Sequence, residues 1–407
     1  MSKTPKLRFK EFSGDWEEKK LGTLGQFLKG SILSKADLSE EGKPCVLYGE
    51  LYTKYSEVIK NVISKTNLEN DKLVLGKKND VLIPSSGETA IDIATASCLQ
   101  QDNVILGGDL NVFRSDKVNG VFTSYQLNSS KKREIARLSQ GASVVHIYNE
   151  QLKKIKLSVP SKEEQEKIAS FFSLIDEKIS LQSEKVEALK DYKRGMMQKI
   201  FSQELRFKAD NDEAYQNWNK KKLIKLTEKI TTKNKDFVIT NVISNSAKNG
   251  LISQRDFFDK DIANQSNIYG YYVIEPGDFV YNPRKSIESP YGPINRYELQ
   301  DAGIVSPLYL CFRVNNEEIN GKFLAYYFKS SVWHRFIYQN SDQGVRHDRV
   351  SIKDAEFFNM DIGVPEIDEQ NKIVKFLDGL ECKLSKEQDK LDYLNEYKKG
   401  LLQEMFI

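Results

Sequence analysis

Hydrophobic residues recur at alternating intervals of four and three positions along two long stretches of the chain, which begin at Ile168 and Ile373. A seven-residue period of this kind keeps one apolar stripe of a helix turned toward a partner helix. Each stripe also carries two polar positions, and these fall at matching places in the two copies. The pattern predicts two long antiparallel helices that pack along a shared seam as a coiled coil. The apolar seam positions are Ile168, Phe172, Ile175, Ile179, Val186, Leu189, Met196 and Ile200 in the first stretch, and Ile373, Leu377, Leu380, Leu384, Leu391, Leu394, Leu401 and Met405 in the second.

The repeat extends beyond the helices into the segments that precede them. Leu7-Arg8-Phe9-Lys10 returns as Leu205-Arg206-Phe207-Lys208, and Gln140-Gly141 returns as Gln343-Gly344. Self-similarity along a chain indicates that one structural unit is present more than once. We therefore predict a pseudo-two-fold internal repeat with four parts. These are a globular domain over 1–159, a helix over 160–204, a second globular domain over 205–364 and a second helix over 365–407.

Each globular half has the pattern of a mixed α/β fold, so the predicted fold class is α+β with two domains separated by the helices. Segments at 122–138 and 323–338 carry the aromatic and aliphatic spacing of helices. Proline at 160 and at 365 predicts that each long helix begins just after the last strand of its half. Short apolar segments bounded by turn residues predict strands at 80–84, 104–106, 110–113, 155–159, 278–282, 308–314 and 360–364.

The composition adds limits on where the protein works. Of the 407 residues, 39% are hydrophobic and 29% are charged, and no apolar run is long enough to cross a bilayer. The first residues are polar, unlike an export signal. The four cysteines are scattered without a C-x-x-C pair, which favours a reducing compartment over a disulfide framework. We expect a cytoplasmic protein without a membrane partner. The net charge of +3 permits nucleic-acid binding without requiring it.

A search for catalytic motifs returns none. The sequence has no phosphate-binding loop of the G-x-x-x-x-G-K-[ST] type and no G-x-G-x-x-G turn after a strand. Tyr281-Asn282-Pro283-Arg284 shares only an Asn-Pro pair with the N-P-P-Y motif of amino-methyltransferases, and we interpret it as a turn at the end of a strand. The three histidines lie far apart without metal-ligand spacing. We therefore expect a chain that is not an enzyme and has no catalytic residues or metal site.

Basic residues gather beside the Gln-Gly pairs of both halves. Each cluster alone is more typical of a solvated surface. Their recurrence beside the same pair in both halves favours contact with phosphates. Arginine, glutamine and asparagine are also the residue types that recognise guanine and adenine in the major groove. The residues that we expect to contact DNA are Lys35, Ser85, Ser86, Lys131, Lys132, Arg133, Gln140, Ser143 and His146 in the first half, and Lys233, Asn282, Arg284, Lys285, Ser286, Gln343, Arg346, His347 and Arg349 in the second.

Over nearly its whole length the chain resembles the specificity subunit (HsdS) of bacterial type I restriction-modification systems. The resemblance rests on the paired Leu-Arg-Phe-Lys segments, each followed by a tryptophan and a Lys-Leu pair, and on the Pro-x-x-x-Glu-Gln openings of the two helices at 160–165 and 365–370. It also rests on Gly195 and Gly400 inside the helices, and on the two-copy layout.

The resemblance implies that each globular half is a target recognition domain for one half of a bipartite, asymmetric site in double-stranded DNA. The paired helices would set the gap between the half-sites and dock two methyltransferase (M) subunits, and restriction (R) subunits would complete the assembly. It further implies that S-adenosylmethionine, ATP and magnesium bind to those partner subunits, so that this chain carries no cofactor.

Other interpretations are open at this point. A freestanding DNA-binding or antirestriction-like protein, a coiled-coil scaffold whose globular halves bind protein, and an enzyme with an unrecognised site are alternatives. The helices are also compatible with a homo-oligomeric coiled coil. Glycine inside a helix costs about 1 kcal/mol relative to alanine. Gly195 and Gly400 therefore predict a close helix approach or a contact with another chain, unless the cost is simply tolerated.

Overall fold

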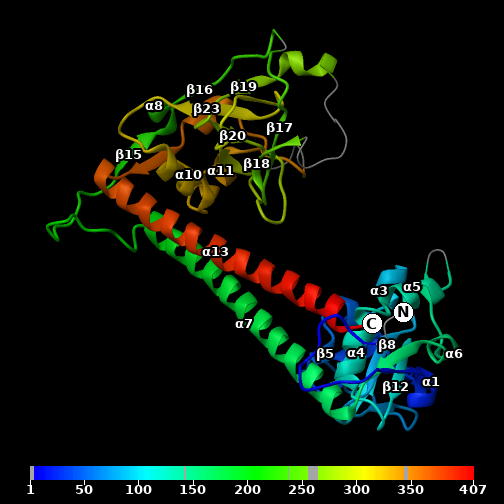
Figure 1. The fold of residues 1–407 in the computed structure, drawn as a ribbon. Coiled ribbons are helices and arrows are strands. Elements are labelled where there is room, and N and C mark those ends of the chain that lie inside the picture. Colours follow the sequence, from blue (N-terminus) through cyan, green and yellow to red (C-terminus); the bar gives the residue numbers. More distant parts are fainter. Residues whose placement is uncertain (1–3, 142–143, 237, 255–264, 343–346) are drawn as a thin grey trace. The chain divides into compact units, whose positions relative to one another are not determined.

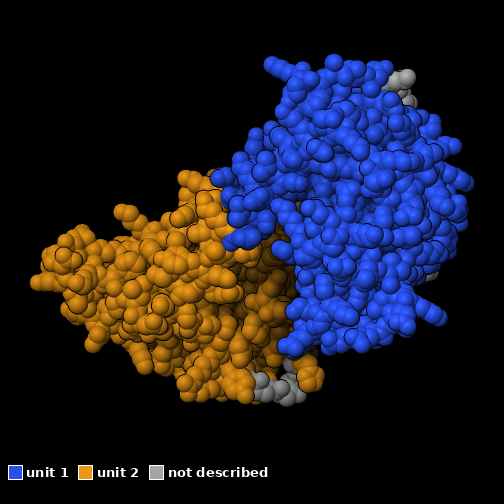
Figure 2. All heavy atoms as spheres, turned by 90° about the horizontal axis from the view of Figure 1, so that it is seen from below, with its two compact units in different colours: residues 1–184, 388–407 blue, residues 185–387 orange. Residues whose placement is uncertain are grey.

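The computed structural model describes residues 4–141, 144–236, 238–254, 265–342 and 347–407, and it divides into two compact units. Unit 1 comprises Met1–Glu184 with Gln388–Ile407, and unit 2 comprises Lys185–Glu387 (Figure 2). Each unit therefore contains part of both long helices, α7 (Lys162–Phe201) and α13 (Ile367–Met405), which Figure 1 labels. The four-part division expected from the sequence places the helices in segments of their own, and it stays a prediction.

Two five-stranded sheets form the body of unit 1, with the strand orders β2-β12-β8-β10-β5 and β3-β6-β4-β11-β7. The predicted strands at 80–84, 104–106, 110–113 and 155–159 are confirmed as β8, β11, β12 and β14. Two smaller antiparallel pairs join β1 (Glu17–Lys20) to β14 (Lys156–Val159) and β9 (Ser86–Gly87) to β13 (Val145–His146). The sheet strands are β2 (Gln26–Lys29), β12 (Leu110–Arg114), β8 (Val81–Pro84), β10 (Ser97–Leu99), β5 (Val58–Ile59), β3 (Leu38–Ser39), β6 (Ser64–Thr66), β4 (Lys43–Val46), β11 (Val104–Leu106) and β7 (Val74–Gly76).

Unit 2 has a four-stranded antiparallel sheet in the order β16-β23-β20-β21, which repeats the β2-β12-β8-β10 portion of unit 1. The predicted strands at 278–282, 308–314 and 360–364 are confirmed as β20, β23 and β24. The sheet strands are β16 (Thr227–Lys229), β23 (Leu310–Val314), β20 (Phe279–Tyr281) and β21 (Ile294–Arg296). Three further pairs are β15 (Asn219–Lys222) with β24 (Asp361–Val364), β17 (Ile243–Ser246) with β18 (Gly250–Ser253), and β19 (Tyr272–Ile274) with β22 (Gly303–Val305).

Short helices connect these strands. In unit 1 they are α1 (Leu21–Leu24), η1 (Lys35–Asp37), α2 (Glu50–Thr53), α3 (Ala90–Ile93), α4 (Gly120–Asn128), α5 (Lys132–Leu138) and α6 (Asn149–Leu152). In unit 2 they are α8 (Leu223–Leu226), η2 (Gln265–Gly270), α10 (Gly321–Lys329), α11 (His334–Asn340) and α12 (Asp354–Phe358).

The predicted helical segments at 122–138 and 323–338 each contain two helices rather than one. Serine follows the first helix in both units. The Ser129 hydroxyl donates to the Tyr125 carbonyl at 2.7 Å, and the Ser330 hydroxyl donates to the Tyr327 carbonyl at 2.6 Å. A serine hydroxyl that bonds a carbonyl of the preceding turn competes with the helical backbone. This chemistry explains why α4 and α10 end where the apolar spacing continues.

The Pro-x-x-x-Glu-Gln openings of the long helices prove to be structural. In unit 1, Arg8 from the Leu-Arg-Phe-Lys segment makes two bonds of 2.8 and 2.7 Å to the buried carboxylate of Glu164. In unit 2, Arg206 makes two bonds of 2.7 and 2.8 Å to Glu369, which is also buried. Paired bonds between a guanidinium and a carboxylate are strong and directional. The two motifs that mark the repeat therefore bind each other in each unit.

The apolar stripes of α7 and α13 lie against each other within each unit. In unit 1, Ile168 and Phe172 near the start of α7 share a buried cluster with Met405 at the end of α13. In unit 2, Ile200 near the end of α7 clusters with Ile373 near the start of α13. The two helices therefore run antiparallel, as predicted. Every apolar seam position from the sequence analysis is buried or half-buried.

The glycines inside the helices lie on open surface. A Cβ atom placed on Gly195 or Gly400 would have no other heavy atom of the described residues within 4 Å, beyond the neighbouring turns of its own helix. The expected close approach of the two helices at these glycines is therefore wrong, because the helices meet along the larger seam side chains instead. The alternatives of a contact with another chain and of a tolerated cost stay open.

Candidate nucleic-acid interface

The β9–β13 pair of unit 1 brings three predicted DNA-contacting residues together. Ser86 pairs with His146 across the two strands, and the Ser86 Oγ lies 2.9 Å from the His146 Nδ1. Gln140 joins the same group through two backbone bonds to His146 of 2.9 and 2.8 Å. The Gln140 side chain is exposed, His146 is half-buried and Ser86 is buried. Short strands with turns on both sides thus hold an amide and an imidazole at one place on the surface.

Tyr148 and Lys29 extend this group, and the sequence analysis missed both. The Tyr148 ring stacks on the His146 ring at 6.3 Å with an angle of 12° between the planes, and the Lys29 ammonium lies 5.8 Å from the Tyr148 centroid. Tyr148 is 48% exposed, so about half of this aromatic residue is open to solvent. An exposed ring beside a lysine suits stacking on a base next to a phosphate. The strand β13 has only two residues, which is too short for an alternation of polar and apolar side chains to indicate an exposed ring just after it.

The other predicted residues of unit 1 lie apart from this group. Lys35 is exposed in η1, and Ser85 is a half-buried residue whose backbone bonds Asp109 and Ile147. The basic run 131–133 opens α5, so the full length of that helix separates it from Gln140. Among the described residues, no hydrogen bond, ion pair or ring contact joins the run to the β9–β13 pair. Ser143 falls outside the described residues.

In unit 2, Arg284 and Arg349 meet across an isolated antiparallel bridge. Backbone bonds hold the two segments in register, from Val350 to Pro283 at 2.8 Å and from Lys285 to Asp348 at 2.9 Å. The two arginines line a small cavity of about 140 Å³, and Arg284 is exposed while Arg349 is half-buried. Two guanidinium groups beside one cavity make a natural site for a base edge or a phosphate.

Tyr309 and Asn282 complete the cavity wall. Burial raises the pKa of Tyr309, while the nearby charges of Arg284 and Arg349 act to lower it. Asn282 uses its side chain inside the protein, because its Nδ2 donates to the Asn245 carbonyl at 3.0 Å and its Oδ1 accepts from the Arg284 backbone at 3.1 Å. Asn282 therefore shapes the turn that presents Arg284, as the strand-end interpretation implied.

The remaining predicted residues of unit 2 are scattered around this site. Lys285 is half-buried next to Arg284, and Ser286 accepts a bond from the Ser289 backbone at 3.1 Å within the same loop. His347 is exposed close to Arg349. Lys233 is exposed and bridges to Tyr272 on a different edge of the unit. Gln343 and Arg346 fall outside the described residues.

The two groups occupy corresponding places in the repeat. Ser86 follows β8 and Arg284 follows the equivalent β20, while His146 and Arg349 precede the last strand of each unit. Both pairs are joined by an antiparallel bridge. The backbone arrangement is therefore repeated while the side chains differ, a serine and a histidine in one unit and two arginines in the other.

Within the described residues no helix is long and apolar enough to span a membrane. The part of the chain that the structure describes likewise contains no group of three or more His, Cys, Asp or Glu arranged to hold a metal ion.

Comparison with known proteins identifies the arrangement. Residues 13–191 match the family model described as type I restriction modification DNA specificity domain. The type I restriction enzyme MjaVIII specificity subunit of Methanocaldococcus jannaschii is 24% identical over 97% of this chain and 94% of its own length. Residues 13–191 thus resemble a type I DNA specificity domain, and over nearly its whole length the chain is similar to type I specificity subunits.

Other relatives and solved structures show the same similarity to specificity subunits. The putative type I restriction enzyme MjaX specificity subunit of the same organism is 21% identical over 98% of this chain and 94% of its own. Among solved structures, the type I S subunit from M. genitalium has a TM-score of 0.56 at 16% identity and covers 99% of both chains. A chain from a study of complex assembly and conformational transition of the type I system has a TM-score of 0.58 at 14% identity, and covers 96% of this chain and 97% of that one. At these identities the solved structures support the shared fold.

Proposed function

We propose that this specificity subunit recognises a bipartite DNA site, with the β9–β13 group of unit 1 at one half-site and the Arg284–Arg349 group of unit 2 at the other. The single observation that carries the proposal is the repeated backbone with exchanged side chains. Two arginines favour guanine O6 and N7, whereas a glutamine beside an imidazole favours a different pattern of donors and acceptors. The two half-sites should therefore differ, and the recognised site should be asymmetric.

The long helices are proposed as the docking surface for two methyltransferase subunits, to which restriction subunits are added. Apolar side chains left exposed on the helices support this role. Leu174, Leu181, Tyr393 and Tyr397 of unit 1 and Tyr192 of unit 2 are all about half exposed or more. Exposed apolar groups on a long helix favour a protein partner. Met197, which also lies on α7, is buried in the core of unit 2 and does not belong to this exposed set.

The chain itself is proposed to be non-catalytic and cytoplasmic. Its role would be to place partner subunits on DNA, and S-adenosylmethionine, ATP and magnesium would bind to those partners. Similarity to specificity subunits supports this division of labour, since their name describes recognition rather than chemistry.

Single-molecule methylome sequencing of cells with and without this chain tests the proposal. We expect methylated adenines at one bipartite, asymmetric motif that disappears when the chain is removed. A methylome unchanged by the removal, in cells whose partner subunits are active, would reject the function. A pull-down of the chain with a methyltransferase subunit distinguishes it from a freestanding DNA-binding protein. A coiled-coil scaffold would bind partners without salt-sensitive, sequence-specific binding of duplex DNA by the assembly.

A further inference from the structure

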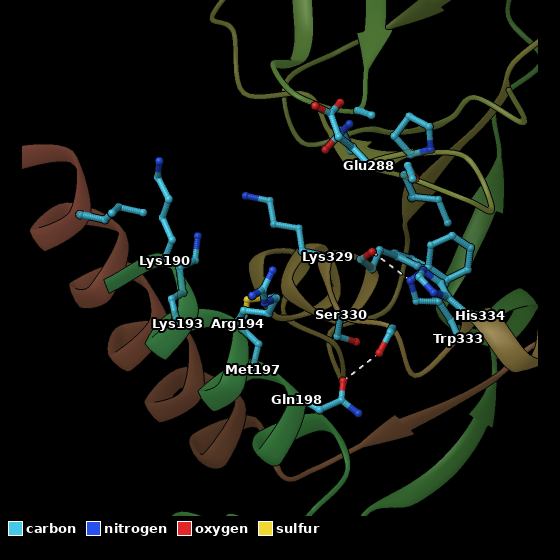
Figure 3. A pocket seen from close by; sticks show the side chains of 18 residues that line it. Lys190, Lys193, Arg194, Met197, Gln198, Glu288, Lys329, Ser330, Trp333 and His334 are labelled. Carbon is cyan, nitrogen blue, oxygen red and sulfur yellow. Dashed lines mark hydrogen bonds between the residues drawn. The ribbon is translucent and has the colours of Figure 1, made fainter. Parts of the chain in front are cut away.

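Unit 2 contains a cavity of about 450 Å³ that the DNA-recognition groups do not use. One wall is the last part of α7, from Lys190 to Gln198, and the other walls are the α10–α11 connection and the loop before β21. This volume falls within the usual range for small-ligand sites, which is about 300–1,000 Å³. Figure 3 shows side chains from α7 and from the end of α10 pointing into the same space.

Positive charge dominates the lining of this cavity. Lys190, Lys193, Arg194 and Lys329 line it, against one carboxylate, Glu288. Lys190 and Arg194 make ion pairs of 2.7 Å with residues one turn away on α7. Such exposed pairs on a helix surface contribute little to stability, so both cations remain available to a ligand.

Lys329 lies close enough to Lys193 to disfavour its charge. Burial, together with the positive charge of Lys329, lowers the pKa of Lys193 to about 8. Lys193 forms an ion pair with Glu381, whose side chain is 45% exposed. The pKa of Lys329 is also lowered by burial, although Glu298 and Asp378 act to raise it. An anion placed between the two lysines would relieve this repulsion.

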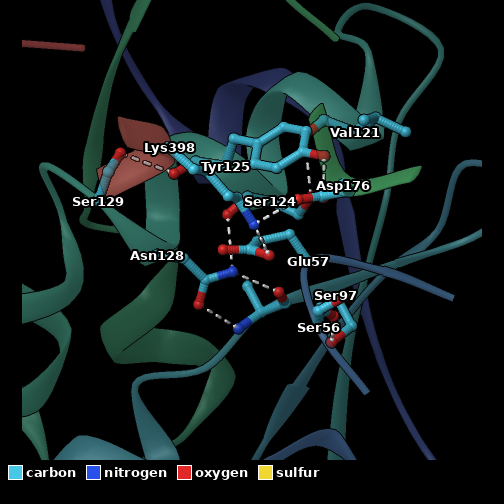
Figure 4. Close-up of polar contacts among 11 residues, drawn as sticks. Ser56, Glu57, Ser97, Val121, Ser124, Tyr125, Asn128, Ser129, Asp176 and Lys398 are labelled. Carbon is cyan, nitrogen blue, oxygen red and sulfur yellow. Dashed lines mark hydrogen bonds and ion pairs between the residues drawn. The ribbon is translucent and has the colours of Figure 1, made fainter. Parts of the chain in front are cut away.

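Unit 1 has a cavity of about 480 Å³ at the corresponding place, and it serves as an internal reference. In the sequence repeat, Lys398 of unit 1 is equivalent to Lys193 of unit 2, and Asn128 is equivalent to Lys329. There the Lys398 ammonium lies 2.7 Å from both the Glu57 and the Asp176 carboxylates, and the Tyr125 hydroxyl donates to Asp176 at 2.5 Å (Figure 4). The lysine of unit 1 is thus neutralised from within the protein.

The repeat therefore holds two equivalent cavities with opposite electrostatic outcomes. In unit 1 the carboxylates of Glu57 and Asp176 bind Lys398. Asn128 of unit 1 takes the position that Lys329 has in unit 2. In the unit 2 cavity Lys193 pairs, among the described residues, with one half-exposed carboxylate, that of Glu381, and shares the lining with Lys329. We propose that the unit 2 cavity, lined by Lys190, Lys193, Arg194 and Lys329, is a binding site for a phosphate group.

A neutral hydrogen-bonding group at the same site fits this ligand. His334 also lines the cavity, whereas the Asn295 Nδ2 donates to Asn245 Oδ1 at 2.7 Å within the protein. Burial lowers the pKa of His334, so its imidazole is neutral near pH 7 and offers a hydrogen bond without adding charge. Several cations with a neutral donor around one concave space match the oxygens of a phosphate. The phosphate is supplied either by a small polyphosphate in solution or by the backbone of bound DNA.

The first experiment measures pyrophosphate binding to the full-length chain by isothermal titration calorimetry. Lys329→Asn copies the residue of the unit 1 cavity, and Lys190→Gln removes a charge from the opposite wall. Losing one charge-assisted contact should weaken binding about tenfold or more. Lys383→Asn is the matched control, because Lys383 is exposed on α13 in the same unit and lies outside the cavity lining.

The second experiment measures the salt dependence of duplex binding for the same variants. Loss of one backbone contact should reduce the slope of log affinity against log salt by about one. A tenfold loss of pyrophosphate binding in the cavity variants, with Lys383→Asn unaffected, supports a small-molecule source. A reduced salt slope with weak pyrophosphate binding supports DNA as the source. Cavity variants that match the wild type in both experiments overturn the site.

The duplex experiment rests on the proposed function, whereas the pyrophosphate experiment does not. Failure of the proposed function would be seen in the wild-type assembly, as an absence of sequence-specific duplex binding. Failure of the phosphate site would be seen in the variants, as unchanged affinity for both ligands.

Discussion

Replacing Lys398 with methionine should destabilise unit 1 by about 3–5 kcal/mol, because it leaves two carboxylates buried without a cation. The Lys398, Glu57 and Asp176 side chains are only 13%, 16% and 19% exposed. Methionine keeps much of the packing volume of lysine, so the loss measures the charge rather than a cavity. For a unit of about 200 residues, 3 kcal/mol corresponds to a fall in the melting temperature of roughly 6–12 °C.

Lys193→Met in unit 2 is the matched comparison. Its carboxylate partner Glu381 is 45% exposed and stays hydrated when the lysine is lost. We expect that variant to lose less than about 1 kcal/mol or to gain stability, because burial already disfavours the charged form of Lys193. Scanning calorimetry of the full chain measures both, and Glu57→Gln with Asp176→Asn should restore part of the stability of Lys398→Met. Equal losses in the two lysine variants, or no rescue by the amides, would refute the reasoning.

Four further predictions follow from the seam, the candidate interface and the buried lysines. Leu189→Asp buries a carboxylate at a half-buried seam position, and should lower the stability of unit 2 by several kcal/mol, measured by urea denaturation; an unchanged midpoint counts against the seam. Arg349→Ala should alter base preference only at the half-site of unit 2, measured by methylome sequencing; a change at both half-sites contradicts the assignment of one unit to each. Because folded Lys193 releases its proton at about pH 8 rather than 10.5, the stability of unit 2 should rise with pH across this window. Lys398 has a raised pKa, since the charges of Glu57 and Asp176 outweigh its burial. Its contribution to the stability of unit 1 should therefore persist between pH 8 and 10.5 and fall only at higher pH. Parallel pH profiles for the two calorimetric transitions, if these are resolved, would contradict this. Adding two helical turns within 161–201 should lengthen the gap between half-sites and leave both half-sites unchanged, and methylome sequencing that shows altered half-sites instead would reject it.

The parts of the fold that were predictable are those with a regular period or a repeated motif. The seven-residue spacing placed Ile168 and Met405 on facing stripes because burial on a helix follows its turn. The two copies of the Leu-Arg-Phe-Lys segment marked the repeat. The break at Ser129 was not predictable, since a single hydroxyl ends the helix while the apolar pattern runs on.

The candidate sites were predictable only in outline. Residue type pointed to Arg284 and Arg349, but their pairing depends on the register of two loops that carry no periodic signal. The neutralisation of Lys398 depends on Glu57, which is distant in sequence and has no counterpart in the repeat pattern. Tyr148 and Lys29 join the first group through a ring stack that residue spacing does not encode.

The chain closes unit 1 with its own last residues, since Met405 and Phe406 pack into the cluster of Trp16, Phe122 and Phe172. Unit 2 is built from one continuous stretch, Lys185–Glu387. Residues 388–407 of unit 1 are therefore synthesised after the whole of unit 2. Removal of residues 388–407 should leave the second unit whole and the first unit without part of its core.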